Sequence, residues 1–380
     1  MPKMWKQGFD FSLRCFFILF QFFPSMKICY VNPFFYPYYG GIEHRIYNVA
    51  KRLATDNEVC IITSRLPKTK AREELDGIKI IRLPSFFVNI YNPPFVRSKG
   101  VYEMIKEIKP DIIDFHYRWA PSYTHAINKI TIPKVFTFHN DFGEGIGIER
   151  IASLGNDLIF KIFLKKFDKI ICISKYIKKR LMKYGIGEEK LAVIYNGIDA
   201  NGEWNEKEDY MLFVGRLVKT KGLDFLIKSL HKYGLNDVNI KIAGKGPMMK
   251  KWKKMASKYK LNMEFMGWVD EERKIELLKK SKAFILPSHY ESFGIVLLEA
   301  MKYGCPIIAR KSGGIPEVVG NAAILVESMH DMADAIRQLA NKPSLVKKLG
   351  KEGLKRVKKF SWDVISKETV KIYEEVATKI

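Results

Sequence analysis

The sequence has few of the residues that build covalent or metal-bound frameworks. Its 380 residues include only five cysteines and seven histidines. The cysteines show no CxxC spacing and the histidines no HExxH pattern, so neither a disulfide framework nor a common zinc site is indicated. Four of the cysteines lie in or beside apolar strand-like runs, where we expect small buried thiols of a reducing compartment.

The chain also lacks an apolar run of the roughly 20 residues that cross a bilayer as a helix. The nearest candidate is CFFILFQFFP, at positions 15–24, which a glutamine interrupts. A basic start before an apolar stretch resembles a signal peptide, but no small-residue cleavage pattern follows. We therefore expect residues 1–25 to be an N-terminal extension or a mis-assigned start rather than an interfacial anchor. The first strand is expected just after Met26.

Charge of one sign dominates, because 65 basic and 41 acidic residues leave a formal net charge of +24. Such an excess suggests an anionic partner, whether nucleic acid, phosphorylated metabolites or a membrane surface. No tail or single stripe holds the excess, so a lysine-rich solvated surface explains it equally well. The basic run KKFDKIICISKYIKKRLMK, residues 165–183, fits a solvated helix face and would also suit a lipid-phosphate acceptor.

Short β-branched runs alternate with helical patterns through most of the chain, and the hydrophobic fraction of 47% is ample for large cores. KICYVN, EVCIIT, IKIIRL, DIIDFH, KVFTFH and KIICIS form one series, which LAVIYNGID ends near Asp199. Runs that are apolar on both faces are typical of parallel strands covered by helices. The pattern restarts at YMLFVGR, and from about Ser328 only helices are indicated.

These two series predict two Rossmann-like α/β domains, which bind a ligand between them at the carboxyl edges of their sheets. We assign residues 26–199 to the first domain, 200–209 to a linker and 210–357 to the second domain. Residues 358–380 are expected to form a final helix.

Several loops at strand ends carry side chains suited to phosphate. In FVGRLVKTKGLDFLIKSL, a strand is expected to end at Gly215 and a helix to begin near Gly222, which places Arg216 and Lys221 at the turn. A guanidinium, an ammonium and the amides of a helix N-terminus together favour an anion. On its own, the same loop also fits an ordinary basic surface.

Three further loops are weaker candidates when taken singly. AGKGP places Gly244 and Gly246 at a strand exit, and FMGWVDEE places Trp268 and Val269 where a nucleobase would rest. A tryptophan at such a place is more often part of a core. In YYGGIEHRI, Gly41 allows close approach of a ligand to the backbone, although a tight turn explains it equally well.

The segment SHYESFGIVLLEAMKYG carries Glu291 and Glu299 at either end of an apolar run. If both acids lay on one helix, their eight positions would span about 12 Å. Glycosidase carboxyl pairs lie about 5–9.5 Å apart, so an acid/base pair fits poorly. We expect a helix that begins around Ser292, with Glu291 before it and Glu299 two turns in. The amides of Phe293, Gly294 and Ile295 would then face an anion at the positive helix end.

With these motifs, the chain resembles retaining GT-B glycosyltransferases of family 4, also called group 1. The resemblance rests on GRLVKTKGLD, AGKGP, FMGWV, ESFGIVLLE, GCPIIARKSGGIPEVV, and YGGIEHRIYNVAKRLA with TFHN, and it covers the chain from about Met26 to the end. It implies a GT-B fold with two Rossmann-like domains that face each other across a cleft. The last helix would return to the first domain.

The resemblance also implies roles for individual residues. Arg216 and Lys221 would hold the diphosphate of a UDP- or GDP-sugar, and Glu299 the ribose hydroxyls. Glu291 and the amides of Phe293 to Ile295 would contact the donor sugar and adjacent phosphate. Gly41 would approach the phosphates from the first domain, and His139 of TFHN would contact the transferring sugar or the acceptor. His116 is expected to be structural.

The implied reaction keeps the anomeric configuration and needs no metal or other cofactor. The acceptor would be a glycan or a lipid-linked molecule. The enzyme would be cytoplasmic and would make peripheral contact with an anionic membrane. Acceptor choice would lie in first-domain loops such as 64–77 and 84–98. Two alternatives stay open at this point: a sugar-nucleotide epimerase of the same architecture, and a nucleic-acid-binding protein, for which no interleaving of aromatic and basic residues is seen.

Overall fold

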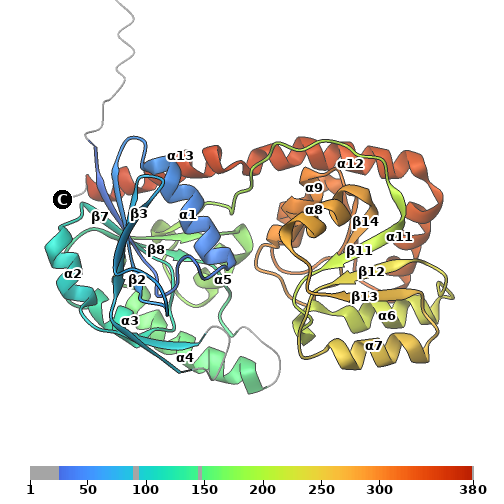
Figure 1. Cartoon of the computed structure of the whole chain (residues 1–380), viewed down its shortest axis with the longest axis horizontal. Coiled ribbons are helices and arrows are strands. Elements are labelled where there is room, and N and C mark those ends of the chain that lie inside the picture. Colours follow the sequence, from blue (N-terminus) through green and yellow to red (C-terminus); the bar gives the residue numbers. More distant parts are fainter. Residues whose placement is uncertain (1–24, 89–93, 144–147, 379–380) are drawn as a thin grey trace, which may run out of the picture.

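The computed structural model of the chain describes residues 25–88, 94–143 and 148–378. The expected extension therefore lies almost wholly outside the described residues. Two α/β units follow each other along the chain, and helices cover both faces of each sheet (Figure 1). This confirms the predicted pair of Rossmann-like units.

The first unit is built on an eight-stranded sheet of order β10-β9-β8-β7-β1-β2-β4-β3, in which only β3 is antiparallel to its neighbour. Its strands are β1 Lys27–Val31, β2 Glu58–Ser64, β3 Arg72–Leu75, β4 Ile78–Leu83, β7 Ile112–Phe115, β8 Lys134–Phe138, β9 Lys169–Cys172 and β10 Leu191–Val193, with a separate hairpin of β5 Ser85–Val88 and β6 Phe95–Ser98. Its helices are α1 Gly41–Leu53, α2 Val101–Ile108, α3 Pro121–Ile127, α4 Ile148–Leu164, α5 Lys175–Lys183 and the 3-10 turn η1 Glu188–Lys190.

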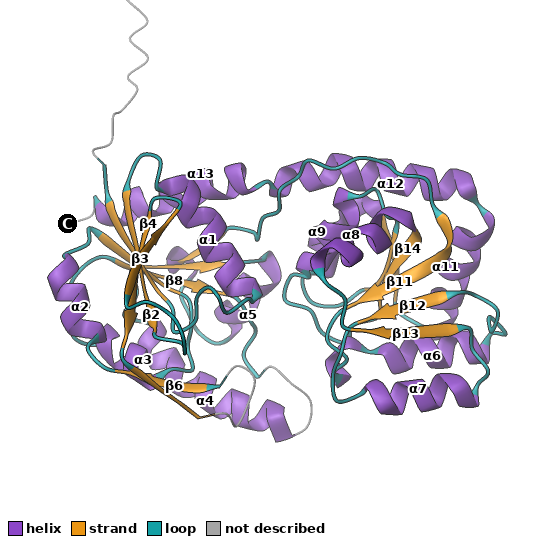
Figure 2. Cartoon of the chain, viewed as in Figure 1, coloured by secondary structure: helices purple, strands orange, loops and turns teal. Residues whose placement is uncertain are grey.

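The second unit holds a fully parallel sheet of order β13-β12-β11-β14-β15-β16. Figure 2 shows β13, β12, β11 and β14 of this sheet side by side. Its strands are β11 Glu208–Val214, β12 Ile240–Ala243, β13 Met263–Gly267, β14 Ser281–Leu286, β15 Ile307–Arg310 and β16 Ala323–Val326. Its helices and 3-10 turns are η2 Lys219–Lys221, α6 Leu223–Lys232, α7 Met249–Lys258, α8 Glu271–Lys280, α9 Ile295–Lys302, α10 Ile315–Val319, η3 Gly320–Ala322, α11 Met329–Asn341 and α12 Pro343–Val357. The 3-10 turn η4 Lys358–Phe360 and α13 Trp362–Ala377 complete the chain.

The predicted strands form because their residues are buried on both faces. All five residues of β8 and all four of β7 are buried, as expected for central parallel strands. The cysteines at positions 29, 60, 172 and 305 are buried free thiols, in agreement with the prediction that they act as small apolar residues.

The C-terminal helix returns to the first unit. Trp362, Ile365 and Tyr373 of α13 belong to the same buried cluster as Ile46 and Val49 of α1. Figure 1 shows α13 beside α1, at the end of the molecule where the first sheet lies. This confirms the predicted return of the last helix.

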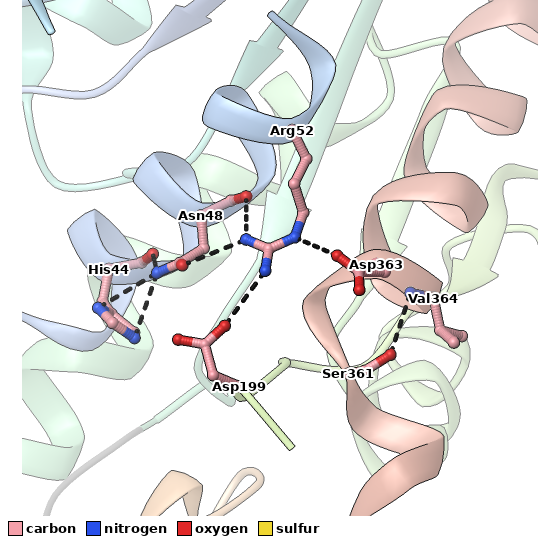
Figure 3. Close-up of polar contacts among 7 residues, drawn as sticks. All are labelled: His44, Asn48, Arg52, Asp199, Ser361, Asp363 and Val364. Carbon is pink, nitrogen blue, oxygen red and sulfur yellow. Dashed lines mark hydrogen bonds and ion pairs between the residues drawn. The ribbon is translucent and has the colours of Figure 1, made fainter. Parts of the chain in front are cut away.

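The chain passes between the two units twice, and the two passages run side by side. Ile198 donates its amide to the Phe360 carbonyl (2.8 Å) and accepts from the Trp362 amide (3.2 Å). Arg52 of α1 holds both passages, because its guanidinium contacts Asp363 at 2.6 Å and Asp199 at 3.2 Å (Figure 3). The two connections of the chain between the units therefore form one paired crossing, which Arg52 fixes to α1.

Candidate active site

The candidate site of the second unit lies where the strand order reverses. Strand β11 lies between β12 and β14, so after β11 the chain crosses to β12 and after β14 it crosses to β15, in opposite directions along the sheet. Ligands of open parallel sheets bind at such a switch point. The loop after β11 carries Arg216 and Lys221, and the loop after β14 carries Glu291. The structure therefore brings these three predicted residues to one place.

The two loops are packed against each other. His289 donates its amide to the Thr220 carbonyl at 2.8 Å. Gly222, the N-cap of α6, has a φ of 65°, and a Cβ there would lie 2.2 Å from the Pro287 carbonyl oxygen. Only glycine meets both conditions, which explains why a glycine follows Lys221.

This packing places the Lys221 ammonium against the Glu291 carboxylate. Nζ and Oε2 lie 2.6 Å apart, and the two side chains are only 23% and 15% exposed. Ser288 Oγ lies 3.4 Å from the same oxygen. Arg216, by contrast, is exposed at the strand exit. One cation is thus held by an acid and the other is open to solvent.

Glu299 has a different lysine partner. Its Oε1 lies 2.9 Å from Nζ of Lys274, on α8. Glu291 and Glu299 are therefore each paired with a lysine of their own, which agrees with the prediction that they do not act on one another. Burial lowers the pKa of His44 on α1. The charge of Glu299 opposes this lowering.

The predicted start of the helix between the two acids is wrong. Helix α9 begins at Ile295 and its N-cap is Gly294, with a φ of 84°. Ser292 does not cap it, because its Oγ lies 2.7 Å from the Tyr290 hydroxyl. Glu299 consequently lies one turn into the helix rather than two. The backbone of Phe293 to Ile295 still forms the helix N-terminus, whose first amides have no acceptor within the helix.

The first unit faces this helix end with the start of α1. A Cβ on Gly41 would lie 3.4 Å from Cδ1 of Ile295, so the two helix N-termini approach each other. Burial is the main cause that raises the pKa of Tyr38, and the charge of Glu43 adds to it. The charge of Arg216 opposes this rise. Arg216 is therefore close enough to act on Tyr38, which lies three residues before Gly41.

The glycines of the loop after β12 have a structural explanation. A Cβ on Gly244 would lie 1.9 Å from the Gly215 carbonyl, and one on Gly246 would lie 2.4 Å from the Leu217 carbonyl. The loops after β11 and β12 therefore need these glycines to pack together. Contact of Gly244 or Gly246 with a donor stays a prediction.

Trp268 follows β13 and is 68% exposed, whereas Val269 is half-buried. A large aromatic ring this open does not belong to the core, so the common structural explanation for Trp268 does not apply.

His139 lies at the end of β8, buried, in a chain of polar contacts. Its Nε2 is 2.9 Å from Nδ1 of His116, whose own Nε2 is 3.2 Å from the Asp114 carboxylate. Burial, with the nearby charges of His116, Arg45 and Arg118, holds the pKa of His139 well below its usual value. His139 is therefore neutral near pH 7. The expectation that His116 is purely structural missed this direct contact with His139.

Asp114 is the buried anchor of that chain. Thr137 Oγ1 donates to it at 2.8 Å, and the Tyr373 hydroxyl of α13 donates at 2.6 Å. Burial alone would raise the pKa of Asp114, but His116 and these hydrogen bonds outweigh burial and lower it. Neither Asp114 nor Tyr373 was predicted, although Asp114 ends an apolar run two residues before His116.

Two more acids with polar contacts in or across the units, Glu43 and Glu317, were not predicted. Glu43, in the first turn of α1, accepts from Asn32 Nδ2 at 3.2 Å, and burial raises its pKa to about 7. Glu317 of α10 accepts from the amides of Lys175 (2.8 Å) and Tyr176 (2.9 Å), at the N-terminus of α5 in the other unit. The motif GGIPEVV contains Glu317 but gives no sign of this contact across the units.

Comparisons with known proteins give the family and agree with the two-unit fold. Residues 39–201 match the family described as Glycosyltransferase Family 4, and residues 196–356 match Glycosyl transferases group 1. The chain is 31% identical over 358 residues to a protein of Methanocaldococcus jannaschii named as the uncharacterized glycosyltransferase MJ1178, with 90% of this chain and 97% of that protein covered.

A more distant relative is the GPI3 subunit of the phosphatidylinositol N-acetylglucosaminyltransferase of Saccharomyces cerevisiae. It is 23% identical over 385 residues, which cover 93% of this chain and 84% of that protein. Among solved structures, Anabaena Alr3699/HepE in complex with UDP and glucose superposes with a TM-score of 0.72 at 17% identity, covering 92% of this chain and all of that one. At this identity the likeness concerns the fold.

Proposed function

The chain belongs to glycosyltransferase family 4, group 1, and is a GT-B glycosyltransferase, and we propose that it moves a sugar from a UDP- or GDP-sugar to a glycan or lipid-linked acceptor with retention. Family membership sets aside the epimerase and the nucleic-acid-binding protein. The observation that carries the proposal is the gathering of Lys221, Arg216 and the N-terminus of α9 at the switch point of the second sheet.

In this proposal the second unit binds the leaving group. The bond between the anomeric carbon and the phosphate oxygen breaks, which leaves negative charge on the nucleoside diphosphate. Lys221, Arg216 and the amides of Phe293 to Ile295 stabilise that charge, so no metal ion is required. Glu291 contacts the donor sugar, and Glu299 the ribose. The nucleobase rests on Trp268 and Val269, beside the loop of Gly244 and Gly246.

The first unit supplies the acceptor side. The acceptor hydroxyl attacks from the face that the diphosphate leaves, and its proton passes to the departing phosphate oxygen. His139, neutral at pH 7, contacts the transferring sugar or the acceptor, and Gly41 leaves room for the phosphates. Support for a lipid-linked acceptor comes from the named activity of the yeast relative, which concerns phosphatidylinositol. A cytoplasmic enzyme in peripheral contact with an anionic membrane remains the predicted setting.

A panel of UDP-, GDP- and ADP-sugars tests the proposal, first by thermal shift and then by release of nucleoside diphosphate. We expect one donor class to stabilise the wild type and to be turned over in the presence of EDTA. NMR of the product should show an unchanged anomeric configuration. Lys221→Ala should lower turnover by roughly a hundred- to a thousand-fold, as loss of one preorganised donor usually does. Near-normal turnover of this variant, or an inverted product, would refute the scheme.

A further inference from the structure

Helix α4 of the first unit presents an apolar face to solvent. Ile151, Leu158, Ile159 and Ile162 are 72%, 48%, 63% and 63% exposed. The spacings of seven and four residues from Ile151 to Leu158 to Ile162 place these three side chains on one stripe of the helix, with Ile159 beside it. Large exposed aliphatic side chains that are contiguous, rather than scattered, mark a surface that contacts something.

The opposite face of α4 fixes this orientation. Asp157 is fully buried and accepts from Arg118 Nε at 2.6 Å and from the Gly143 amide at 2.9 Å. Phe160 and Leu164 are buried in the core of the first unit. A buried carboxylate needs its guanidinium partner, so α4 cannot rotate to hide the isoleucines without breaking this pair. The apolar face is therefore held outward.

Basic side chains continue the helix at its C-terminal end. Lys165 and Lys166 are exposed directly after α4, and Lys190 donates to the Lys165 carbonyl at 2.8 Å. An apolar helix face with lysines beside it is the pattern of helices that lie in the interface of an anionic bilayer. A protein partner with a plain apolar groove would not need these charges. Among the described residues, no helix is both long and apolar enough to span a membrane.

We propose that α4 is a membrane-docking surface, which sets Ile151, Leu158, Ile159 and Ile162 among lipids at the headgroup level while Lys165 and Lys166 contact anionic headgroups. Helix α4 lies at the outer edge of the first unit in Figure 1. In the sequence, α4 begins nine residues after His139. A lipid-linked acceptor would then reach the first unit from the bilayer. This last step alone rests on the proposed function.

Flotation with vesicles tests the proposal on the full chain. The wild type should bind vesicles of phosphatidylcholine mixed with phosphatidylglycerol more tightly than pure phosphatidylcholine vesicles. Ile159→Gln with Ile162→Gln should weaken binding to the mixed vesicles by about ten- to a hundred-fold, because each methylene buried among the lipids contributes to the free energy of binding. Lys165→Glu with Lys166→Glu should lower binding to the mixed vesicles about tenfold or more, and leave binding to neutral vesicles unchanged.

Matched controls exist on surfaces far from α4 in sequence. Val364→Gln removes another exposed apolar side chain, on α13, and Lys347→Glu with Lys348→Glu reverses two exposed lysines of α12. Both controls should float like the wild type. Thermal melting should be unchanged in all variants, since every substituted side chain is at the surface.

Wild-type binding by both α4 variants would overturn the proposal, because any membrane affinity would then lie outside α4. A wild-type dimer in vesicle-free gel filtration that Ile159→Gln with Ile162→Gln converts to a monomer would overturn it in favour of a second copy of the chain. Vesicle binding that depends on α4 in a protein that releases no nucleoside diphosphate from any donor would support the docking surface and refute the proposed function instead.

Discussion

Replacing Glu291 by glutamine tests what the Lys221–Glu291 pair does before a donor binds. The ammonium that should hold the diphosphate is engaged by a carboxylate 2.6 Å away. A diphosphate that enters the site must compete with Glu291 for that ammonium, and it also meets the negative charge of Glu291. We therefore expect Glu291→Gln to bind free UDP or GDP more tightly than the wild type, while its turnover of the intact donor falls.

The magnitude follows from the environment of the pair. A hydrogen bond between charged groups contributes about 1.5–3 kcal/mol, and some water reaches both side chains, which are 23% and 15% exposed. If loss of the ion pair makes nucleotide binding more favourable by about 1–2 kcal/mol, the affinity increases roughly five- to thirty-fold. Lys221→Ala should act in the opposite direction, since it removes the cation and leaves the acid beside the phosphates.

Calorimetry of UDP and GDP binding at low ionic strength measures this effect, because salt screens it. Glu276→Gln is the matched control: it removes one acid from α8 that pairs with Lys280, outside the site, and should leave the affinity unchanged. The double variant of Lys221 and Glu291 completes a cycle. Weaker UDP and GDP binding by Glu291→Gln would refute the reasoning, since Glu291 would then orient Lys221 for the phosphates rather than compete with them.

Three further predictions concern residues that the sequence did not point to. Burial raises the pKa of Glu43 from 4.5 to about 7, so the contribution of Glu43 to stability is complete below pH 4.5 and is lost as the pH rises through 7. Relative to Glu43→Gln, the wild type should lose about 3 kcal/mol of unfolding free energy between pH 4.5 and 8, measured by urea unfolding. Parallel curves of stability against pH for the two proteins would contradict this. Tyr373→Phe should lower the free energy of unfolding by about 1.5–3 kcal/mol, because it removes a hydrogen bond to the buried Asp114 carboxylate, whereas Tyr47→Phe at the surface should cost less; equal losses would argue against a special role of Tyr373. Glu317→Ala should open the two units, seen as a larger radius of gyration in X-ray scattering, because α5 loses the carboxylate at its N-terminus; an unchanged curve would show that other contacts hold the units together.

The two-unit fold was predictable because central parallel strands are apolar on both faces and appear as short continuous runs. Strand β3 escaped this signal, since all four of its residues are exposed, and it pairs antiparallel at the sheet edge. The hairpin of β5 and β6 escaped as well, because each strand has only four residues and exposes part of them. The segments 64–77 and 84–98, expected to be loops, therefore contain these strands.

Within the site, the acids and cations were predictable because strand ends and glycines marked the loops that carry them. The helix start was not, because Ser292 is a common N-cap residue and only the structure reveals that Tyr290 occupies its hydroxyl. A local pattern states what a side chain is able to do, whereas its actual partner depends on which neighbour lies closer in space.

The contact between Tyr373 and Asp114 shows the same limit at long range. The two residues are 259 positions apart, and no spacing rule relates them. They meet because α13 returns to the first unit and packs against β7 and β8, where the Tyr373 hydroxyl reaches Asp114, which also contacts His116. His116 in turn contacts His139, so the side chains of Tyr373, Asp114 and His116 join the last helix to His139. The return of α13 thus does more than complete the core of the first unit. Loss of the Tyr373 hydroxyl should disturb the position of His139 as well as the stability of the fold.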